Sequence, residues 1–173
     1  MNFSLAQHEV YTDASVGHHY GRPVGGIAWI DSDGQYEVGT HVTRVPLVAE
    51  LAAIHLALLA HPGRPVTVVS DCRPALKALD HAARTGVIAL PPSPGGNREA
   101  ARLVHRIGLE RQGRAVTLRW VKGHAGHPLN EAADRLAVQA RRCVQNGGRL
   151  RDIAVLAERI AADVRIPAPR RAS

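Results

Sequence analysis

Two aspartates lie at the ends of predicted strands, where carboxylates can be brought together to bind a metal ion. Asp13 is at the end of a strand predicted over residues 9–14, and Asp71 directly follows a buried strand predicted over 65–70. If these strands are parallel neighbours, both carboxylates emerge at the carboxyl edge of the sheet. Open α/β sheets bind their ligands at that edge.

Two further acids lie beside the apolar stripes of predicted helices. Glu50 belongs to a helix predicted over 46–60, and Asp134 flanks the stripe of a helix predicted over 129–144. Four carboxylates at the margins of a core repel one another unless cations lie between them. Hard oxygen ligands without a cluster of thiolates suit Mg²⁺ or Mn²⁺ better than zinc. The four acids therefore favour a divalent-cation site.

Each acid also has a purely structural explanation. In that alternative, Asp13 only ends a strand and Asp71 is the N-cap of a helix predicted over 73–83. Glu50 and Asp134 are then solvated residues on the polar sides of their helices.

The elements that must position these acids follow from apolar periodicity and from the turn residues between them. In chain order we predict strands over 9–14, 27–30 and 35–42, a helix over 46–60, a strand over 65–70, helices over 73–83 and 97–112, a strand over 115–121 and a helix over 129–144. A glycine-containing loop is expected between the first two strands, and a hairpin between the second and third. The prediction is an α/β fold with a mixed five-stranded sheet, an antiparallel meander followed by β-α-β units, flanked by helices.

The sequence Asn146-Gly147-Gly148 interrupts the last helix and marks the predicted end of the main domain. We expect one domain over 1–145 and a C-terminal extension over 146–173. The extension is predicted to hold an amphipathic helix over 149–165 and a basic tail that includes Arg170 and Arg171.

The composition favours a polyanionic partner. The net charge is +7, and Arg outnumbers Lys by 20 to 2, which suits phosphate recognition by planar guanidinium groups. The alternative explanation is a GC-rich genome, which also favours Arg over Lys. No apolar run reaches the roughly 18 residues that span a bilayer, and residues 1–8 lack the features of a secretory signal. We expect a cytoplasmic protein without a membrane partner.

Four segments resemble the type 1 ribonuclease H family over about residues 8–142. They are Tyr11-Thr12-Asp13-Ala14-Ser15, Ala49-Glu50-Leu51, Ser70-Asp71 and the block from Trp120 to Ala137, which reads WVKGHAGHPLNEAADRLA. The last block is the specific one, because chance does not reproduce so many positions in order.

The resemblance implies an endonuclease that hydrolyses the RNA strand of RNA/DNA hybrids with two Mg²⁺ or Mn²⁺ ions. It assigns Asp13, Glu50, Asp71 and Asp134 as the metal ligands. The cleaved RNA is expected to carry 5′-phosphate and 3′-hydroxyl ends. It also assigns His124 to proton transfer or product departure, a role suited to imidazole. His127 is expected to be structural. No small-molecule cofactor is implied, and we expect a monomer.

Recognition of the hybrid is assigned to two groups of residues. Arg98, Arg102 and Arg106 recur every four residues and form a cationic stripe that could follow a phosphate backbone, with a solvated helix face as the alternative explanation. The residues expected near the substrate's minor groove and the metal site are Ser15, Gly17, Thr43, Arg44 and Asn130.

The sequence departs from the family pattern at the residues after three motif positions. Ala14 replaces a frequent Gly, Arg44 and Val45 replace a frequent Asn pair, and Cys72 replaces Ser or Gln. The basic, Trp-containing handle of some bacterial members is absent. Two alternatives therefore stay open: another metal nuclease of the same fold, such as a DNA resolvase or an exonuclease, and a silent hybrid-binding module. An exonuclease is expected to carry an acid where Ser15 stands.

Overall fold

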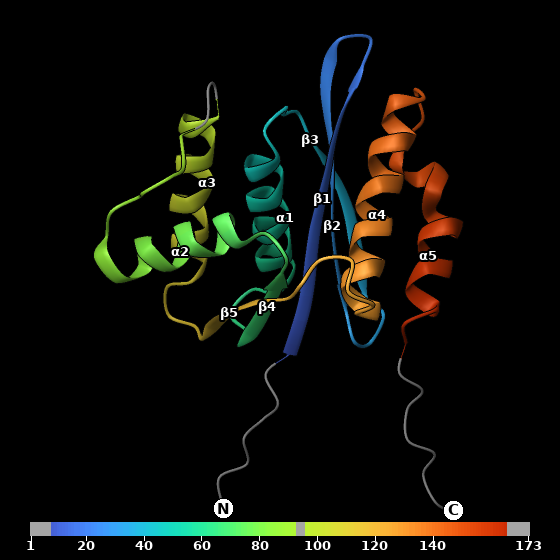
Figure 1. Cartoon of the computed structure of the whole chain (residues 1–173). Helices are drawn as coiled ribbons and strands as arrows, with labels where there is room; N and C mark the ends of the chain where they lie inside the picture. The colour runs from blue at the N-terminus through green and yellow to red at the C-terminus, as the bar shows by residue number, and fades with distance from the viewer. Residues whose placement is uncertain (1–7, 93–95, 166–173) are drawn as a thin grey trace, which may run out of the picture.

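A computed structural model describes residues 8–92 and 96–165 and shows a five-stranded mixed sheet in the order β3-β2-β1-β4-β5 (Figure 1). The strands are β1 (His8–His19), β2 (Arg22–Asp31), β3 (Tyr36–His41), β4 (Val66–Ser70) and β5 (Val116–Trp120). The helices are α1 (Pro46–Ala60), α2 (Arg73–Thr85), α3 (Asn97–Glu110), α4 (Pro128–Gln145), the 3₁₀ helix η1 (Leu150–Ile153) and α5 (Ala154–Ala162). The predicted α/β fold class is confirmed.

The sheet combines a local meander with two long-range parallel pairings. Strand β2 pairs antiparallel with both β1 and β3, whereas β4 pairs parallel with β1 and β5. Every residue of β4 is buried, as expected for a short central strand covered on both faces. Tyr11 is the register partner of Val69, so residues that follow them in β1 and β4 lie at the same level of the sheet.

The prediction of a loop between the first two strands is wrong, because both strands continue through this region. Strand β1 extends to His19 and β2 begins at Arg22, which leaves a turn of Tyr20 and Gly21 with φ values of +47° and +75°. Two consecutive residues with positive φ are typical of the tight turns that match strand twist. Gly26 in this region is instead required for packing, because a Cβ there would lie 2.1 Å from the carbonyl oxygen of Ala137 in α4.

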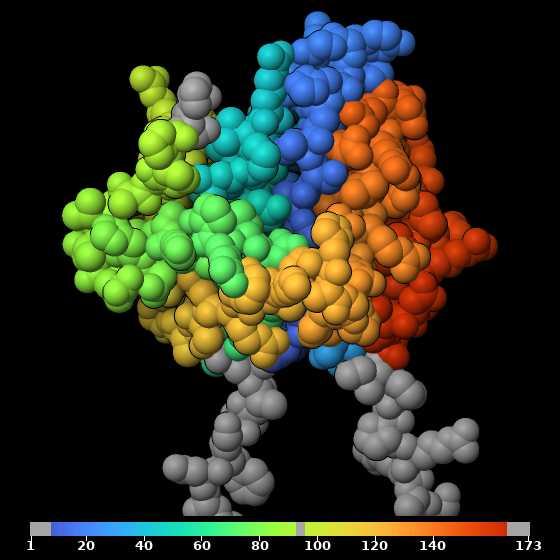
Figure 2. All heavy atoms as spheres, viewed as in Figure 1, coloured from blue at the N-terminus to red at the C-terminus, as the bar shows by residue number. Residues whose placement is uncertain are grey.

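Helices cover both faces of the sheet. On one face α1, α2 and α3 pack with Ile27, Val66 and Val68, and on the other α4 and α5 pack with Tyr11 and Val69. Figure 1 shows these two groups of helices on opposite sides of the sheet. In the space-filling view, the surface is hollowed where α1 (teal), β1 (blue) and α4 (orange) meet (Figure 2).

The C-terminal helix belongs to this packing. Ala157, Ile160 and Ala161 of α5 are buried in the same apolar cluster as Leu136 of α4. The helix predicted over 149–165 is thus present as η1 and α5, whereas the predicted basic tail lies outside the described residues. Within the described parts of the chain, no helix is both long and apolar enough to cross a bilayer.

Candidate active site

Three carboxylates from three elements converge at one position in the sheet. Asp13 lies in the middle of β1, Glu50 in α1, and Asp71 directly after β4. One carboxylate oxygen from each lies within 4.8 Å of the other two. The parallel register explains the meeting of the aspartates, since each is two residues beyond the paired Tyr11 and Val69.

Burial and mutual repulsion disfavour the charged forms of two of these acids. Asp13 is only 6% exposed, and this burial, together with the charges of Asp71 and Asp134, raises its pKa to about 8. Burial, followed by the charges of Asp13 and Asp71, raises the pKa of Glu50 well above its ordinary value. Oxygen Oε2 of Glu50 is buried without a hydrogen-bond partner in the described structure. Glu50 is therefore not a solvated helix residue.

Asp71 does not cap a helix. Cys72 is the N-cap of α2, with no side-chain capping hydrogen bond. Instead, Nδ2 of the buried Asn130 lies 3.4 Å from Oδ2 of Asp71 and donates a hydrogen bond to it. A Cβ at Gly123 would lie 2.4 Å from the same oxygen, so the loop before α4 approaches Asp71 closely.

Asp134 of α4 stands at the edge of this group. It is not among the three residues whose oxygens lie within 4.8 Å, yet its charge contributes to the raised pKa of both Asp13 and Glu50. Of the described residues, no Lys, Arg or His forms an ion pair with any of the four acids. Three converging carboxylates, a fourth nearby and an unpartnered buried oxygen fit hard divalent cations as the missing counter-charge.

The two histidines of the loop before α4 have different environments. His124 is exposed and has φ of +50°, an uncommon conformation for a residue other than glycine. His127 is the N-cap residue of α4, with Nε2 3.2 Å from the hydroxyl of Tyr11 and the two rings 4.8 Å apart. His127 is thus packed against the sheet, while His124 is exposed to solvent.

The predicted nucleic-acid contacts lie in several separate parts of the structure. Arg98, Arg102 and Arg106 are all exposed on α3, opposite its buried face. Ser15 and Gly17 lie instead beside the C-terminal half of α4. The hydroxyl of Ser15 accepts a hydrogen bond of 2.9 Å from Nε of Arg141.

Thr43 and Arg44 lie between β3 and α1 and make local contacts. Thr43 is 5% exposed, and its hydroxyl accepts a hydrogen bond of 3.1 Å from the backbone N–H of Val45. Arg44 donates a 2.8 Å hydrogen bond to the carbonyl of Gly21 in the β1–β2 turn.

Sequence reasoning missed two polar contacts around the site. The guanidinium of Arg73 stacks over Trp120 at 3.7 Å, and Nε1 of Trp120 donates to the backbone oxygen of Asp71 at 3.1 Å. Arg141 was also missed, although it holds Ser15. The only sequence signal for these residues was Trp120 itself, which begins the specific block.

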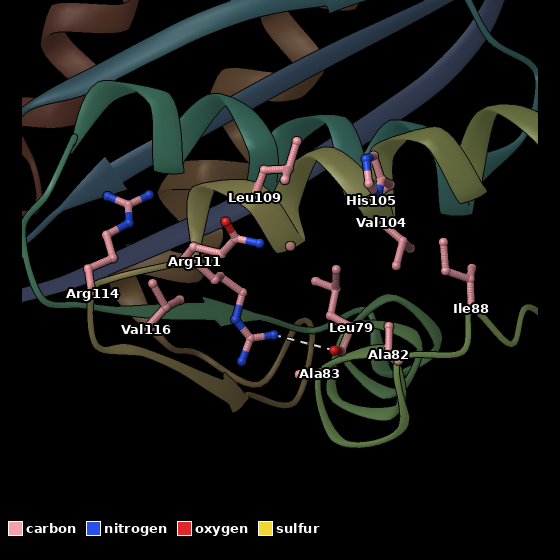
Figure 3. Close-up of a pocket in the computed structure, with 13 residues that line it drawn as sticks. Leu79, Ala82, Ala83, Ile88, Val104, His105, Leu109, Arg111, Arg114 and Val116 are labelled. Carbon is pink, nitrogen blue, oxygen red and sulfur yellow. Dashed lines mark hydrogen bonds between the residues drawn. The ribbon is translucent and has the colours of Figure 1, made fainter.

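A cavity of about 520 Å³ lies between α2, α3 and β5, away from the carboxylates (Figure 3). Its wall includes Leu79, Val104 and Val116, and none of the four acids lines it. Arg111 spans one side and donates a 3.3 Å hydrogen bond to the carbonyl of Leu79. This space is a gap between packed helices and contributes nothing to the carboxylate site.

A sheet of order β3-β2-β1-β4-β5, with acids converging beyond the parallel pair β1 and β4, defines a ribonuclease H-like α/β protein. The family model for RNase H matches residues 6–142, and the chain belongs to this family.

Curated relatives are similar over most of their length. A ribonuclease H of Anaeromyxobacter dehalogenans is 32% identical over 84% of this chain and 77% of its own. The ribonuclease HI of Caulobacter vibrioides is 32% identical over 74% of this chain and 88% of its own. A ribonuclease H of Tropheryma whipplei is 31% identical over 66% of this chain and 73% of its own.

Proposed function

We propose that this protein is an endoribonuclease that hydrolyses the RNA strand of RNA/DNA hybrids. The observation that carries the proposal is the convergence of Asp13, Glu50 and Asp71, with Asp134 beside them and no ion pair to neutralise them in the described residues. Membership of the RNase H family supports the substrate class.

The four acids would hold two Mg²⁺ or Mn²⁺ ions. Such ions, when bound, activate water for in-line attack and stabilise the leaving 3′ oxygen, which gives 5′-phosphate and 3′-hydroxyl ends. Asn130 orients Asp71 through its hydrogen bond to Oδ2. His124, exposed in the loop before α4, accepts or donates a proton at the imidazole ring as substrate enters and product leaves.

The hybrid would contact the protein on both sides of the carboxylates. Ser15 and Gly17 lie in β1 and Arg44 contacts the β1–β2 turn, and we assign these residues, together with Thr43, to the minor groove of the hybrid. Arg98, Arg102 and Arg106 on α3 would follow the phosphate backbone.

We assign residues 1–145 to the catalytic domain and 146–173 to an extension. The family match ends at residue 142, and the extension that follows packs α5 against α4. All four acids come from one chain, so we propose that the monomer is active.

The test compares one labelled sequence as an RNA/DNA, an RNA/RNA and a DNA/DNA duplex, each with Mg²⁺ or Mn²⁺. We expect cleavage of the RNA strand in the hybrid alone, with products carrying 5′-phosphate ends. Cleavage of DNA would instead indicate another nuclease of the same fold, and binding without cleavage would indicate a silent module.

The variant Asp71→Asn tests whether the carboxylate group is the site of hybrid cleavage. We expect cleavage to fall by at least about 10³-fold because a metal ligand is lost, while hybrid binding measured by fluorescence anisotropy stays within about twofold. The metal-free Tm is expected not to fall, because one like-charge repulsion is removed. Asp80→Asn on the exposed face of α2 is the matched control and should retain full activity. Substantial residual cleavage by Asp71→Asn would show that Asp71 is not a ligand.

A further inference from the structure

A second group of metal-ligating side chains lies at the end of the sheet where β1 begins, away from the four acids. His8 begins β1, Asp31 ends β2, and His61 is the C-cap residue of α1. One ligand atom from each lies within 4.8 Å of the other two. Asp31 is 0% and His61 3% exposed. Asp13 is five residues further along β1 than His8, which separates the two groups by about 16 Å.

The hydrogen bonds around His61 determine which of its nitrogens is available. Nδ1 lies 2.7 Å from the carbonyl oxygen of Ala57, which can only accept a hydrogen bond. Nδ1 must therefore carry the proton, and Nε2 keeps a free lone pair. A backbone carbonyl that binds one ring N–H is a common outer partner of a histidine metal ligand. Arg114 further fixes this end of α1 by donating to the carbonyls of Leu58 and His61.

The carboxylate of Asp31 has one satisfied and one unsatisfied oxygen. Oδ1 accepts hydrogen bonds from the backbone N–H groups of Asp33 at 3.0 Å and Gln35 at 2.8 Å. Oδ2 lies 3.0 Å from Nε2 of His8, within ion-pair distance. Neither atom makes a well-directed hydrogen bond to any described residue, and both are buried. The two atoms face each other as ligands of a common ion do.

We propose that His8, Asp31 and His61 bind a divalent transition-metal ion of the zinc type. Two imidazoles and one carboxylate suit zinc, whereas Mg²⁺ prefers oxygen ligands alone. Ligand atoms about 2.0–2.2 Å from a tetrahedral zinc ion lie about 3.4 Å apart. The pair His8 and Asp31 already meets that spacing, and His61 needs a shift of at most about 1.5 Å. A water molecule completes the fourth position.

Such an ion would stabilise the fold by joining three elements that are distant in the sequence. It connects the start of β1, the end of β2 and the end of α1. The ring of Trp29, itself 5% exposed, lies edge-on to His61 at 4.8 Å and shields the group from solvent. We assign the ion a structural role, because it would join three elements at residues of which Asp31 and His61 are buried.

The test uses the full chain, stripped of metal with a chelator and titrated with Co²⁺ in excess Mg²⁺. Excess Mg²⁺ occupies the carboxylates, so we expect one equivalent of Co²⁺ to give the visible absorption of a four-coordinate ion, which Zn²⁺ then abolishes. Zinc at about 100 times its Kd should raise Tm by about 5–10 °C. Asp71→Asn should retain both effects because its site is separate.

The variants His8→Gln and His61→Gln should each lose the Co²⁺ absorption and the rise in Tm. The matched control is His105→Gln, which changes an exposed histidine of α3 and should behave as the unmodified protein. Far-UV circular dichroism and hybrid cleavage show that each variant is folded. Of the two variants, His8→Gln is the less disruptive to folding, since the His8 side chain is 18% exposed. Absorption that survives both variants, or a Tm that depends on pH but not on zinc, would overturn the proposal.

Discussion

The raised pKa of Asp13 makes the stability of the metal-free protein depend on pH. Its pKa is about 8 in the folded chain against 3.8 without the fold, so between these values the folded state binds more protons than the unfolded state. This contribution to stability is complete below about pH 3.8 and is lost as pH rises through 8. In EDTA we expect the free energy of unfolding by urea to fall by about 2–5 kcal/mol from this group over that range.

The variant Asp13→Asn provides the comparison that isolates this effect from the other titrating groups. Its stability should change less with pH than that of the unmodified protein, and the two curves should diverge most above pH 7. Saturating Mg²⁺ should remove most of the divergence, because bound cations favour the ionised carboxylate. Parallel curves in EDTA would show that Asp13 titrates normally.

A second prediction for a single residue concerns His124. We expect His124→Ala to slow single-turnover cleavage by about 10²-fold to 10⁴-fold but not to abolish it, since proton transfer assists a reaction that does not depend on it entirely. The positive φ of His124 requires a control for backbone strain, and Asn tolerates this conformation well. His124→Asn should therefore be as slow as His124→Ala. Full activity of either variant would exclude the proton-transfer role.

Among the elements, α3 carries the stripe of Arg98, Arg102 and Arg106. If each neutralises a phosphate, changing all three to Gln should reduce the slope of log K against log [salt] by about 2.7, at about 0.9 per contact. The rate at saturating hybrid should change little, because uniform binding does not accelerate the chemical step.

The control for this stripe removes the same charge from other elements. Arg142, Arg151 and Arg159 are exposed on α4, η1 and α5, and their conversion to Gln gives a matched variant. Its salt slope should remain that of the unmodified protein. Equal slopes in all three proteins would make the α3 stripe a solvated helix face.

The contact between β2 and α4 depends on the absence of a side chain at Gly26. A Cβ there would meet two backbone atoms of α4, Ala137 O at 2.1 Å and Arg141 N at 2.5 Å, so the helix would have to move. We expect Gly26→Ala to destabilise the protein by about 1–3 kcal/mol in urea unfolding. It should also raise the Mg²⁺ concentration needed for cleavage, since α4 carries Asp134.

Gly108→Ala on α3 is the control for this substitution. A Cβ at Gly108 meets nothing within 4 Å, and alanine is the better helix residue. It should leave cleavage unchanged and stabilise the protein slightly. If Gly26→Ala did the same, α4 would not be held at the distance that the structure gives.

For the molecule as a whole, the features that could be predicted from the sequence are those that depend on local patterns of residues. The sheet type, the helices and the acids beside them follow from periodicity and spacing, and the specific block from Trp120 to Ala137 indicates the family. The length of the β1–β2 hairpin was missed because the reason for Gly26 is its contact with α4, far away in the chain. The contact of Arg141 with Ser15 spans 126 positions and has no local signal at all. The grouping of His8, Asp31 and His61 was missed for the same reason.

The parallel pairing of β1 with β4 has a consequence for folding kinetics. Thr12 and Val69 meet across this pair although 57 positions separate them, whereas the β1–β2–β3 meander closes through short turns. Loop closure makes the distant pairing the slower event, so the meander is expected to form before β4 docks. Asp13 and Asp71 come together only at that late step, and their repulsion opposes it. The carboxylate site is thus expected to form after the meander, and divalent cations that relieve the repulsion should accelerate refolding as well as cleavage.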